Sequence, residues 1–171
     1  MPEILLGAGS NHSKKLGFSP EWNGLVTVDI NPDHKPDVLH DLSVLPLPFA
    51  DDCADEIHAY DVMEHVGAQG DWRFFFDQWS DIWRVLKPGG VFFGISPHHS
   101  SPWAWGDPGH TRIVGKEQLF FLSQPNYAEV GKTPMTDYRF CYRADFDQIE
   151  SAVTQDRQYA YALRAVKPAR L

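Results

Sequence analysis

The chain has 171 residues, of which 43% are hydrophobic and 22% are charged. Length and composition predict one globular domain and exclude collagen-like, coiled-coil and disordered chains. The formal net charge of −8 disfavours nucleic acid and anionic membranes as partners. Apolar runs are far shorter than a membrane span and no signal peptide is recognisable, so we expect a cytoplasmic protein without membrane contact. Cys53 and Cys141 are expected to be buried thiols in a reducing compartment rather than a disulfide.

Short apolar runs bounded by Gly, Pro and Asn predict the strands of the first two thirds of the chain. In chain order they are Ile4–Leu6, Gly24–Ile30, Asp37–His40, Glu56–Tyr60 and Val91–Ser96. One or two helical turns are expected over residues 12–17. A longer helix begins after Asp71, because the residues at offsets 0, +4, +7, +8 and +11 trace one apolar face: Phe75, Trp79, Ile82, Trp83 and Leu86. Residues 87–90, Lys-Pro-Gly-Gly, end that helix.

The last third contains a predicted helix over Gly115–Leu122 and two aromatic strands, Tyr138–Phe146 and Tyr159–Val166. Strands that alternate with helices are typical of βαβ units and a mainly parallel sheet. The sequence therefore predicts an α/β, Rossmann-like, doubly wound sheet of seven strands in a single domain. The two C-terminal strands are expected to form an antiparallel edge pair.

A glycine turn follows the first predicted strand and suggests a ligand site. Gly7, Ala8 and Gly9 let a ligand approach the backbone closely, and Asp29 ends the next strand twenty residues later. A carboxylate there can accept hydrogen bonds from both hydroxyls of a ribose. Asp41, after the third strand, is placed for the polar edge of a base. These three points suit an adenosine-bearing ligand, although a plain tight turn would also contain such glycines.

The pattern does not fit other nucleotide sites well. A dinucleotide fingerprint requires a third glycine where this chain has His12, which disfavours NAD. A G-x-x-x-x-G-K-[ST] phosphate loop is absent from the sequence.

Six motifs in order and spacing resemble the class I S-adenosylmethionine (SAM)-dependent methyltransferases, in the group of small methyltransferase-domain proteins. They are Leu5–Gly9, Val28–Pro32, Pro36–Leu42, Leu45–Phe49, Asp61–Val66 and Trp83–Gly90. The resemblance covers roughly residues 4–122 and implies a single methyltransferase domain over residues 1–171, without the N-terminal cap helices of many relatives. It also implies that SAM is the cofactor and S-adenosylhomocysteine (SAH) the product.

The resemblance assigns cofactor roles to particular residues. Gly7, Ala8 and Gly9 would line the methionine part, and Asp29 would bind the ribose hydroxyls. The adenine would pack on Ile30 and lie beside Asp41 and Leu42, while Tyr60 and Asp61 would close the pocket. Glu64 and His65 also match the family pattern, either as ligand contacts or as a brace for the next helix.

Two positions depart from the family. Leu5 stands where relatives usually have a carboxylate, and Asn11 stands where they tend to have a third glycine. Asn tolerates left-handed backbone geometry, so the turn can survive the second change. With the missing cap, these departures leave an alternative open, namely a degenerate methyltransferase fold that acts as a non-catalytic binding or regulatory subunit. A homodimer or a partner subunit would then cover the cofactor site.

The segment Ser96–Arg112 is rich in His and Trp and follows the fifth strand, where acceptor sites lie in such folds. His98 or His110 is the candidate general base for an acceptor hydroxyl or amine. His110 could equally pair with Asp107 and only fix the loop. A zinc site from His98, His99 and His110 lacks ligand spacing typical of zinc, so we expect no metal.

Trp103 and Trp105 either form a wall for a sugar or planar acceptor or fill a hydrophobic hole. Residues 74–76, three phenylalanines, are expected in the core. The arginines could hold an anionic acceptor or lie scattered on the surface: Arg112, Arg139 and Arg143. The aromatic tail shapes an acceptor pocket or a dimer contact: Tyr127, Tyr138, Phe140 and Tyr142. The sequence thus predicts methyl transfer from SAM to an oxygen or nitrogen of a small-molecule or glycan-type acceptor.

Overall fold

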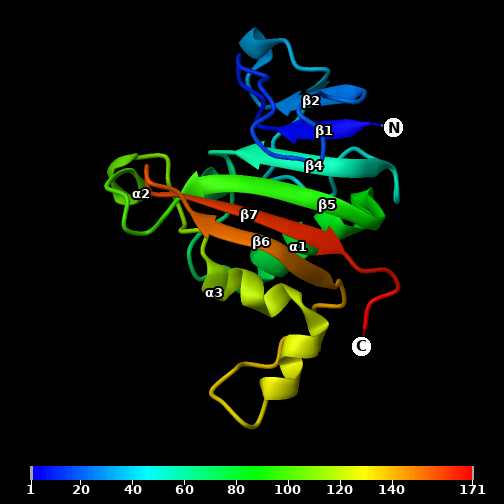
Figure 1. The fold of residues 1–171 in the computed structure, drawn as a ribbon, viewed down its shortest axis with the longest axis vertical. Helices are drawn as coiled ribbons and strands as arrows, with labels where there is room; N and C mark the ends of the chain where they lie inside the picture. Colours follow the sequence, from blue (N-terminus) through cyan, green and yellow to red (C-terminus); the bar gives the residue numbers. More distant parts are fainter. Residues whose placement is uncertain (1, 171) are drawn as a thin grey trace.

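The computed structural model describes residues 2–170, and within them seven strands form one sheet in the order β3-β2-β1-β4-β5-β7-β6 (Figure 1). All pairs are parallel except β5–β7 and β6–β7, which are antiparallel. The strand order reverses between β1 and β4, so the predicted doubly wound sheet with an antiparallel C-terminal pair is confirmed. The strands are β1 (Glu3–Leu6), β2 (Leu25–Asp29), β3 (Val38–Leu39), β4 (Ala54–Tyr60), β5 (Leu86–Pro97), β6 (Phe146–Val153) and β7 (Gln158–Ala165).

Helix α1 (Trp72–Val85) covers one face of the sheet. The Asp71 carboxylate caps it by accepting a hydrogen bond from the backbone N–H of Phe74 at 3.1 Å, as predicted. Its apolar face packs on alternate residues of the central strands in the main core. That core includes Trp79 and Ile82 of the helix with Ile4, Leu6, Ile57, Ala59 and Phe92 of the sheet. The helix ends at Val85, and β5 follows directly because the backbone of Leu86 is extended.

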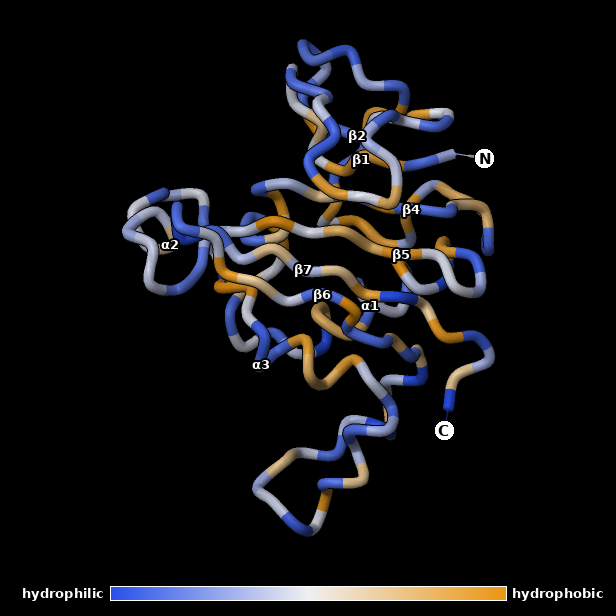
Figure 2. Tube along the Cα trace, in the orientation of Figure 1, coloured by the Kyte–Doolittle hydropathy of each residue, from blue (hydrophilic) through white to orange (hydrophobic). Residues whose placement is uncertain are grey.

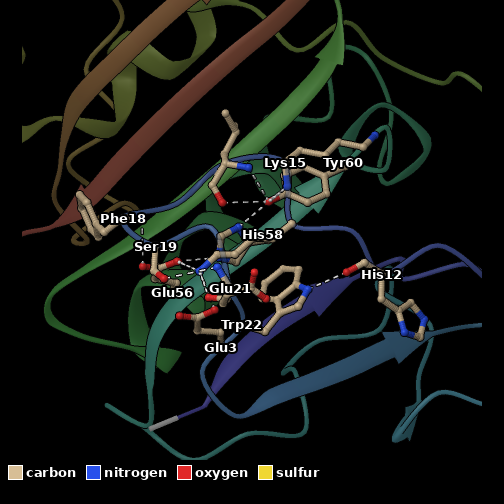
Figure 3. A network of polar contacts seen from close by, with 12 residues as sticks. Glu3, His12, Lys15, Phe18, Ser19, Glu21, Trp22, Glu56, His58 and Tyr60 are labelled. Atoms are coloured by element: carbon tan, nitrogen blue, oxygen red, sulfur yellow. Dashed lines mark hydrogen bonds and ion pairs between the residues drawn. The ribbon is translucent and has the colours of Figure 1, made fainter.

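The opposite face of the sheet is covered by an irregular segment, residues 11–24, instead of the expected helical turns over 12–17. The reason is chemical: the sheet presents buried polar side chains here, and the segment is tied to them. Lys14 Nζ donates to Glu3 Oε2 at 2.7 Å, lies 3.0 Å from Glu56 Oε2 and is 5.1 Å from the centre of the Trp22 ring. The fully buried His58 is hydrogen-bonded to Glu56 at 2.9 Å and to Tyr60 at 2.7 Å (Figure 3).

Two loops shape the carboxyl end of the sheet. The first contains a 3₁₀ turn, η2 (Met63–His65), after β4. The second follows β5 and contains α2 (Trp103–Gly106), which projects beyond the sheet (Figure 1). Figure 2 shows that the loop around α2 is more hydrophilic than the central strands. A further 3₁₀ turn, η1 (Pro32–His34), lies between β2 and β3.

The predicted helix over 115–122 consists of α3 (Lys116–Leu119) continued by η3 (Phe120–Leu122), and η4 (Gln124–Glu129) follows. The predicted strand Tyr138–Phe146 is wrong, because β6 begins only at Phe146. The preceding residues form a loop whose buried polar groups bond elsewhere. Tyr142 Oη donates to the carbonyl of Leu122 at 2.9 Å, and Asp145 accepts from the N–H of Gln124 at 2.9 Å.

Both cysteines are free, but only Cys53 is partly buried, and Cys141 is exposed, so the expectation of two buried thiols is wrong for the second. No helix among residues 2–170 has the length and apolar character needed to cross a membrane.

Candidate functional site

The glycine turn after β1 has the backbone geometry that its residues permit. Gly7 and Gly9 have φ angles of +58° and +56°, in the left-handed region that favours glycine. A Cβ on Gly7 would lie 2.4 Å from Val62 Cγ2, so this glycine is also required by space. A Cβ on Gly9 would meet nothing within 4 Å, because Gly9 faces open space. Asn11 does not adopt a left-handed φ, so the turn is made by Gly7 and Gly9 without it.

Asp29, at the end of β2, holds this turn. Its carboxylate accepts hydrogen bonds from the backbone N–H of Gly9 at 2.7 Å and of Asn31 at 2.8 Å, and His34 lies 3.3 Å away. Burial alone would raise the pKa of this carboxyl, but the two N–H donors and His34 outweigh it and lower the pKa. Asp29 is therefore an ionised group at neutral pH, beside the turn, as a ribose acceptor must be.

A cavity of about 250 Å³ opens at the glycine turn. Its lining includes the turn, Tyr60 at the end of β4, and Leu5 and Lys15. Lys15 was not predicted from the sequence, since only the irregular path of residues 11–24 brings it here. Its ammonium lies 3.3 Å from the Asp61 carboxylate and 5.3 Å from the centre of the Tyr60 ring. The cavity thus has an apolar wall at Leu5 and a charged rim.

The other predicted cofactor residues lie on the neighbouring strand ends but do not line this cavity. Ile30 is 64% exposed, which leaves an apolar surface for a planar ring. Asp41 accepts hydrogen bonds from the backbone and hydroxyl of Ser43, at 2.8 and 2.7 Å. Leu42 is buried in the core, so its contact with a ligand is limited to its small exposed part.

A second, larger hollow lies beside α2 and α3. It consists of two adjoining cavities of about 530 and 320 Å³ that share Gln69, Arg112, Glu117 and Gln118, and we refer to it as the Arg112 cleft. The first cavity is also lined by His99, Trp105 and His110, and the second by Trp72, Phe75, Phe76, Phe121 and Tyr138. Aromatic and charged groups together are typical of a small-molecule site.

The two candidate bases are placed differently. His110 lines the Arg112 cleft, with Nε2 at 3.9 Å from Glu64 Oε1 and 4.0 Å from Asp107 Oδ2. The side-chain contact with Asp107 is too long for a hydrogen bond, but the backbone N–H of His110 donates to the Asp107 carbonyl at 3.2 Å, so Asp107 fixes the loop through the backbone. His98 does not line the cleft, and its Nδ1 lies 2.8 Å from the hydroxyl of Ser100.

Glu64 is 2% exposed and lies beneath His110. One carboxylate oxygen accepts a hydrogen bond from the hydroxyl of Ser96 at 2.9 Å, whereas Oε1 has no hydrogen-bond partner. Burial raises the pKa of this carboxyl, and the Ser96 bond only partly opposes the rise. Glu64 therefore braces the loop on one side and presents an unpaired oxygen on the other.

Burial distinguishes between the two roles that the sequence left open for the arginines. Arg112 is 6% exposed and donates to the carbonyl of Met63 at 2.8 Å and to Gln78 at 2.6 Å, and burial lowers its pKa to about 10. It is a buried cation at the cleft, not a scattered surface arginine. By contrast, Arg139 is paired with Asp137 on the surface, and Arg143 is exposed.

Burial also separates the aromatic residues of the core from those of the cleft and the surface. Trp103 and Trp105 are 69% and 72% exposed, so neither fills a hydrophobic hole. Phe76 lies in the core as predicted, and Tyr127 and Tyr142 are buried there too. Tyr138 lines the cleft, whereas Phe140 is 70% exposed.

Comparison with known proteins agrees with this geometry. A family model described as the methyltransferase domain matches residues 15–94. Comparison with curated protein sequences gives no match. Among solved structures, a SAM-dependent methyltransferase from Archaeoglobus fulgidus superposes with a TM-score of 0.60 at 16% identity, covering 95% of this chain and 85% of that one.

Two further structures bear on ligands and partners. One is a complex between the Haloferax volcanii Trm112 methyltransferase activator and a methyltransferase. It has a TM-score of 0.60 at 14% identity and covers 96% of this chain and 82% of that one. The other is the N-methyltransferase NodS from Bradyrhizobium japonicum WM9 with SAH, which has a TM-score of 0.57 at 14% identity and covers 96% of this chain and 77% of that one. These likenesses show a shared fold.

The family match and the shared fold confirm the predicted resemblance to the SAM-dependent methyltransferases. Over the matched segment and in its fold, the chain is thus similar to SAM-dependent methyltransferases, a class whose cofactor is SAM.

Proposed function

We propose that this chain binds SAM in the cavity at the glycine turn and transfers its methyl group to an oxygen or nitrogen of a small-molecule or glycan-type acceptor in the Arg112 cleft. The observation that carries the proposal is the hydrogen bond from Gly9, which lines that cavity, to Asp29 at the end of the neighbouring strand. It fixes a glycine turn and an ionised carboxylate side by side, as an adenosine with a charged amino-acid tail requires. Ile30 supplies an exposed apolar surface for the adenine.

The acceptor side is supported by the composition of the Arg112 cleft. Trp105, Phe121 and Tyr138 suit a planar or sugar-like acceptor, and the buried Arg112 adds positive potential. Because the sulfonium of SAM is already activated, the protein has to position the acceptor and manage its proton. Of the two candidate histidines, we place His110 rather than His98 beside the acceptor, because only His110 lines the cleft.

We also propose that a second copy or a partner subunit covers the adenine side. Three large apolar side chains are exposed around the β2–β3 edge: Ile30, Leu39 and Val44. The Haloferax relative was solved together with an activator protein, which supports this arrangement. Light scattering on the purified chain distinguishes the two cases, since a homodimer doubles the mass and a monomer requires a separate partner.

The proposed function is tested by calorimetric titration of the purified chain with SAH, with NAD and ATP as controls. Micromolar binding of SAH alone is expected, because the glycine turn lacks the third glycine of a dinucleotide site. No binding of SAH would overturn the proposal and favour the non-catalytic subunit.

A further inference from the structure

Glu64, His65 and His110 form a cluster on two loops at the carboxyl ends of β4 and β5. Each has a ligand-type atom, and these atoms lie within 4.8 Å of one another. His65 and His110 pack edge to face, with ring centres 4.5 Å apart. The sequence pattern suggested a zinc site only among His98, His99 and His110. In the structure, His110 instead lies beside Glu64 and His65, which follow β4.

The cluster contains a buried polar atom without a partner. Glu64 is 2% exposed, and its Oε1 has no hydrogen bond. His110 Nε2 is the nearest basic atom at 3.9 Å, beyond hydrogen-bond distance. Two ligands about 2.1 Å from a common ion can be at most about 4.2 Å apart, so the distance from Nε2 to Glu64 Oε1 fits around one ion.

A comparable cluster elsewhere in the molecule shows how such a charge is normally neutralised. Glu3, Glu56 and His58 also bring three ligand-type atoms together, but the Lys14 ammonium lies 2.7 and 3.0 Å from the two carboxylates. Across residues 2–170, no Lys or Arg nitrogen lies within 4.0 Å of a Glu64 carboxylate oxygen, and the buried Arg112 interacts with Glu64 only from farther away. Because burying a carboxylate without a close counter-charge is costly, the Glu64 cluster lacks the directly paired cation that the Lys14 cluster has.

His65 is also oriented as a metal ligand requires. His65 Nδ1 lies 3.1 Å from the carbonyl of Gly109, and donation of its N–H to that oxygen leaves the lone pair on Nε2. A carbonyl oxygen on the far ring nitrogen is the usual outer partner of a metal-bound histidine. Gly109 precedes His110 in the chain, so the same contact holds the two ligand-bearing loops together.

We infer that Glu64, His65 and His110 bind one divalent transition-metal ion. Two imidazoles and one carboxylate suit Zn²⁺, Co²⁺ or Mn²⁺ better than Ca²⁺ or Mg²⁺. The ion lies at the rim of the Arg112 cleft, because His110 lines that cleft. His110 is then a metal ligand, and not the general base that was predicted from the sequence.

The role of the ion in the reaction rests on the proposed function. A hydroxyl oxygen of the acceptor coordinates the ion, which lowers the pKa of that hydroxyl, and its proton leaves to solvent. A lone pair of the oxygen then forms the bond to the methyl carbon. The carbon–sulfur bond of SAM breaks with its electrons going to sulfur, which gives neutral SAH. The acceptor class favoured by this chemistry is a diol or phenol rather than an amine.

The test is titration of chelator-treated, full-length protein with Co²⁺, followed by its visible absorption, and with Mn²⁺, followed by the resonance signal of the free ion. One ion per chain is expected to bind. His110→Ala and His65→Ala should each weaken binding at least about tenfold. His98→Ala and His99→Ala are the matched controls from the same loop and should leave binding unchanged. Glu64→Gln keeps the Ser96 contact and should also weaken binding.

Equal losses in the His98 and His110 variants, or no stoichiometric binding to the folded wild type, would overturn the site. SAH affinity measured on the same samples separates the two proposals: a chain that binds SAH but no ion refutes only the metal site, and a chain that binds the ion but no SAH refutes only the proposed function. Catechol should shift the Co²⁺ spectrum of the wild type. An unchanged spectrum would make the ion structural and overturn its role toward the acceptor.

Discussion

The backbone N–H of Gly9 donates a 2.7 Å hydrogen bond to Asp29 Oδ2, across the gap between the ends of β1 and β2. The bond joins two residues twenty positions apart and fixes the carboxylate beside the glycine turn. The second oxygen of Asp29 accepts from the N–H of Asn31 at 2.8 Å, so two fixed donors hold the group ionised. Asp29 therefore supports the turn as well as the proposed ribose contact.

Replacement of Asp29 should separate these two roles. Asp29→Asn keeps the shape of the side chain but removes the charge and leaves one oxygen for the two N–H donors, so the turn keeps one of its two bonds. We expect it to weaken SAH binding by roughly 1–3 kcal/mol because ribose hydroxyls lose a charged acceptor. Asp29→Ala also frees the turn and should lower the melting temperature further. The control is Asp33→Ala, an exposed residue of the same loop. Calorimetry in which all three variants match the wild type would remove Asp29 from the site.

The two glycines of the turn should respond differently to alanine. Gly7→Ala adds a left-handed strain of about 1 kcal/mol and a clash with Val62, for a total loss of roughly 2–4 kcal/mol in the free energy of unfolding. Gly9→Ala has only the strain, about 1 kcal/mol. Denaturant unfolding compares the two. Adding Val62→Ala should restore part of the loss in Gly7→Ala, and an absence of any rescue would contradict the clash.

Much of the fold could be predicted because periodicity and turn residues act locally. The apolar spacing of α1, its Asp71 cap and the glycine turn after β1 are all written in short stretches of sequence. The residues around 12–17 were mispredicted because their path depends on partners distant in the chain: Lys14 bonds to Glu3 and Glu56, and no local pattern contains that contact. The strand predicted at 138–146 failed similarly, since Tyr142 and Asp145 bond to residues near 122–124.

The site was predictable to the same extent. The glycine turn and Asp29 follow from where strands end, and the structure brings them into contact. Lys15 and the grouping of Glu64 with His110 could not be found in this way. Lys15 reaches the cavity through an irregular segment, and the Glu64–His110 approach joins two loops that are 46 residues apart in numbering. Such contacts depend on loop conformation, which sequence patterns do not specify.

Lys15 gives a prediction about the amino-acid end of the cofactor. Its ammonium and the Asp61 carboxylate, 3.3 Å apart at the rim of the cavity, match the opposite charges of the SAH carboxylate and ammonium. Lys15→Gln should weaken SAH binding about tenfold. It should leave 5′-methylthioadenosine unaffected, because that compound lacks the amino-acid group. Lys116→Gln, an exposed lysine on α3, is the matched control. Equal losses for both ligands would mean that Lys15 acts on the fold and not on the tail of the cofactor.

The buried His58 predicts how stability depends on pH. Burial, with a further contribution from the Lys14 ammonium, lowers its pKa from 6.5 to about 3, so the ring stays neutral in the folded protein where the unfolded chain already binds a proton. The folded state therefore loses stability as pH falls below 6.5, by roughly 2 kcal/mol between pH 6 and pH 4.5. That window lies above the range in which the carboxylates with lowered pKa values titrate, among them Asp29 and Asp37.

Urea unfolding at several pH values measures this slope. His58→Gln retains a donor toward Glu56 and an acceptor toward Tyr60 but cannot titrate, so its stability should fall less steeply between pH 6 and pH 4.5 than that of the wild type. His12→Gln removes an exposed histidine of the same covering segment and should keep the wild-type slope. A slope that is unchanged in His58→Gln would show that His58 is protonated in the folded protein, paired with Glu56, and that the neutral ring assigned to the buried network is wrong.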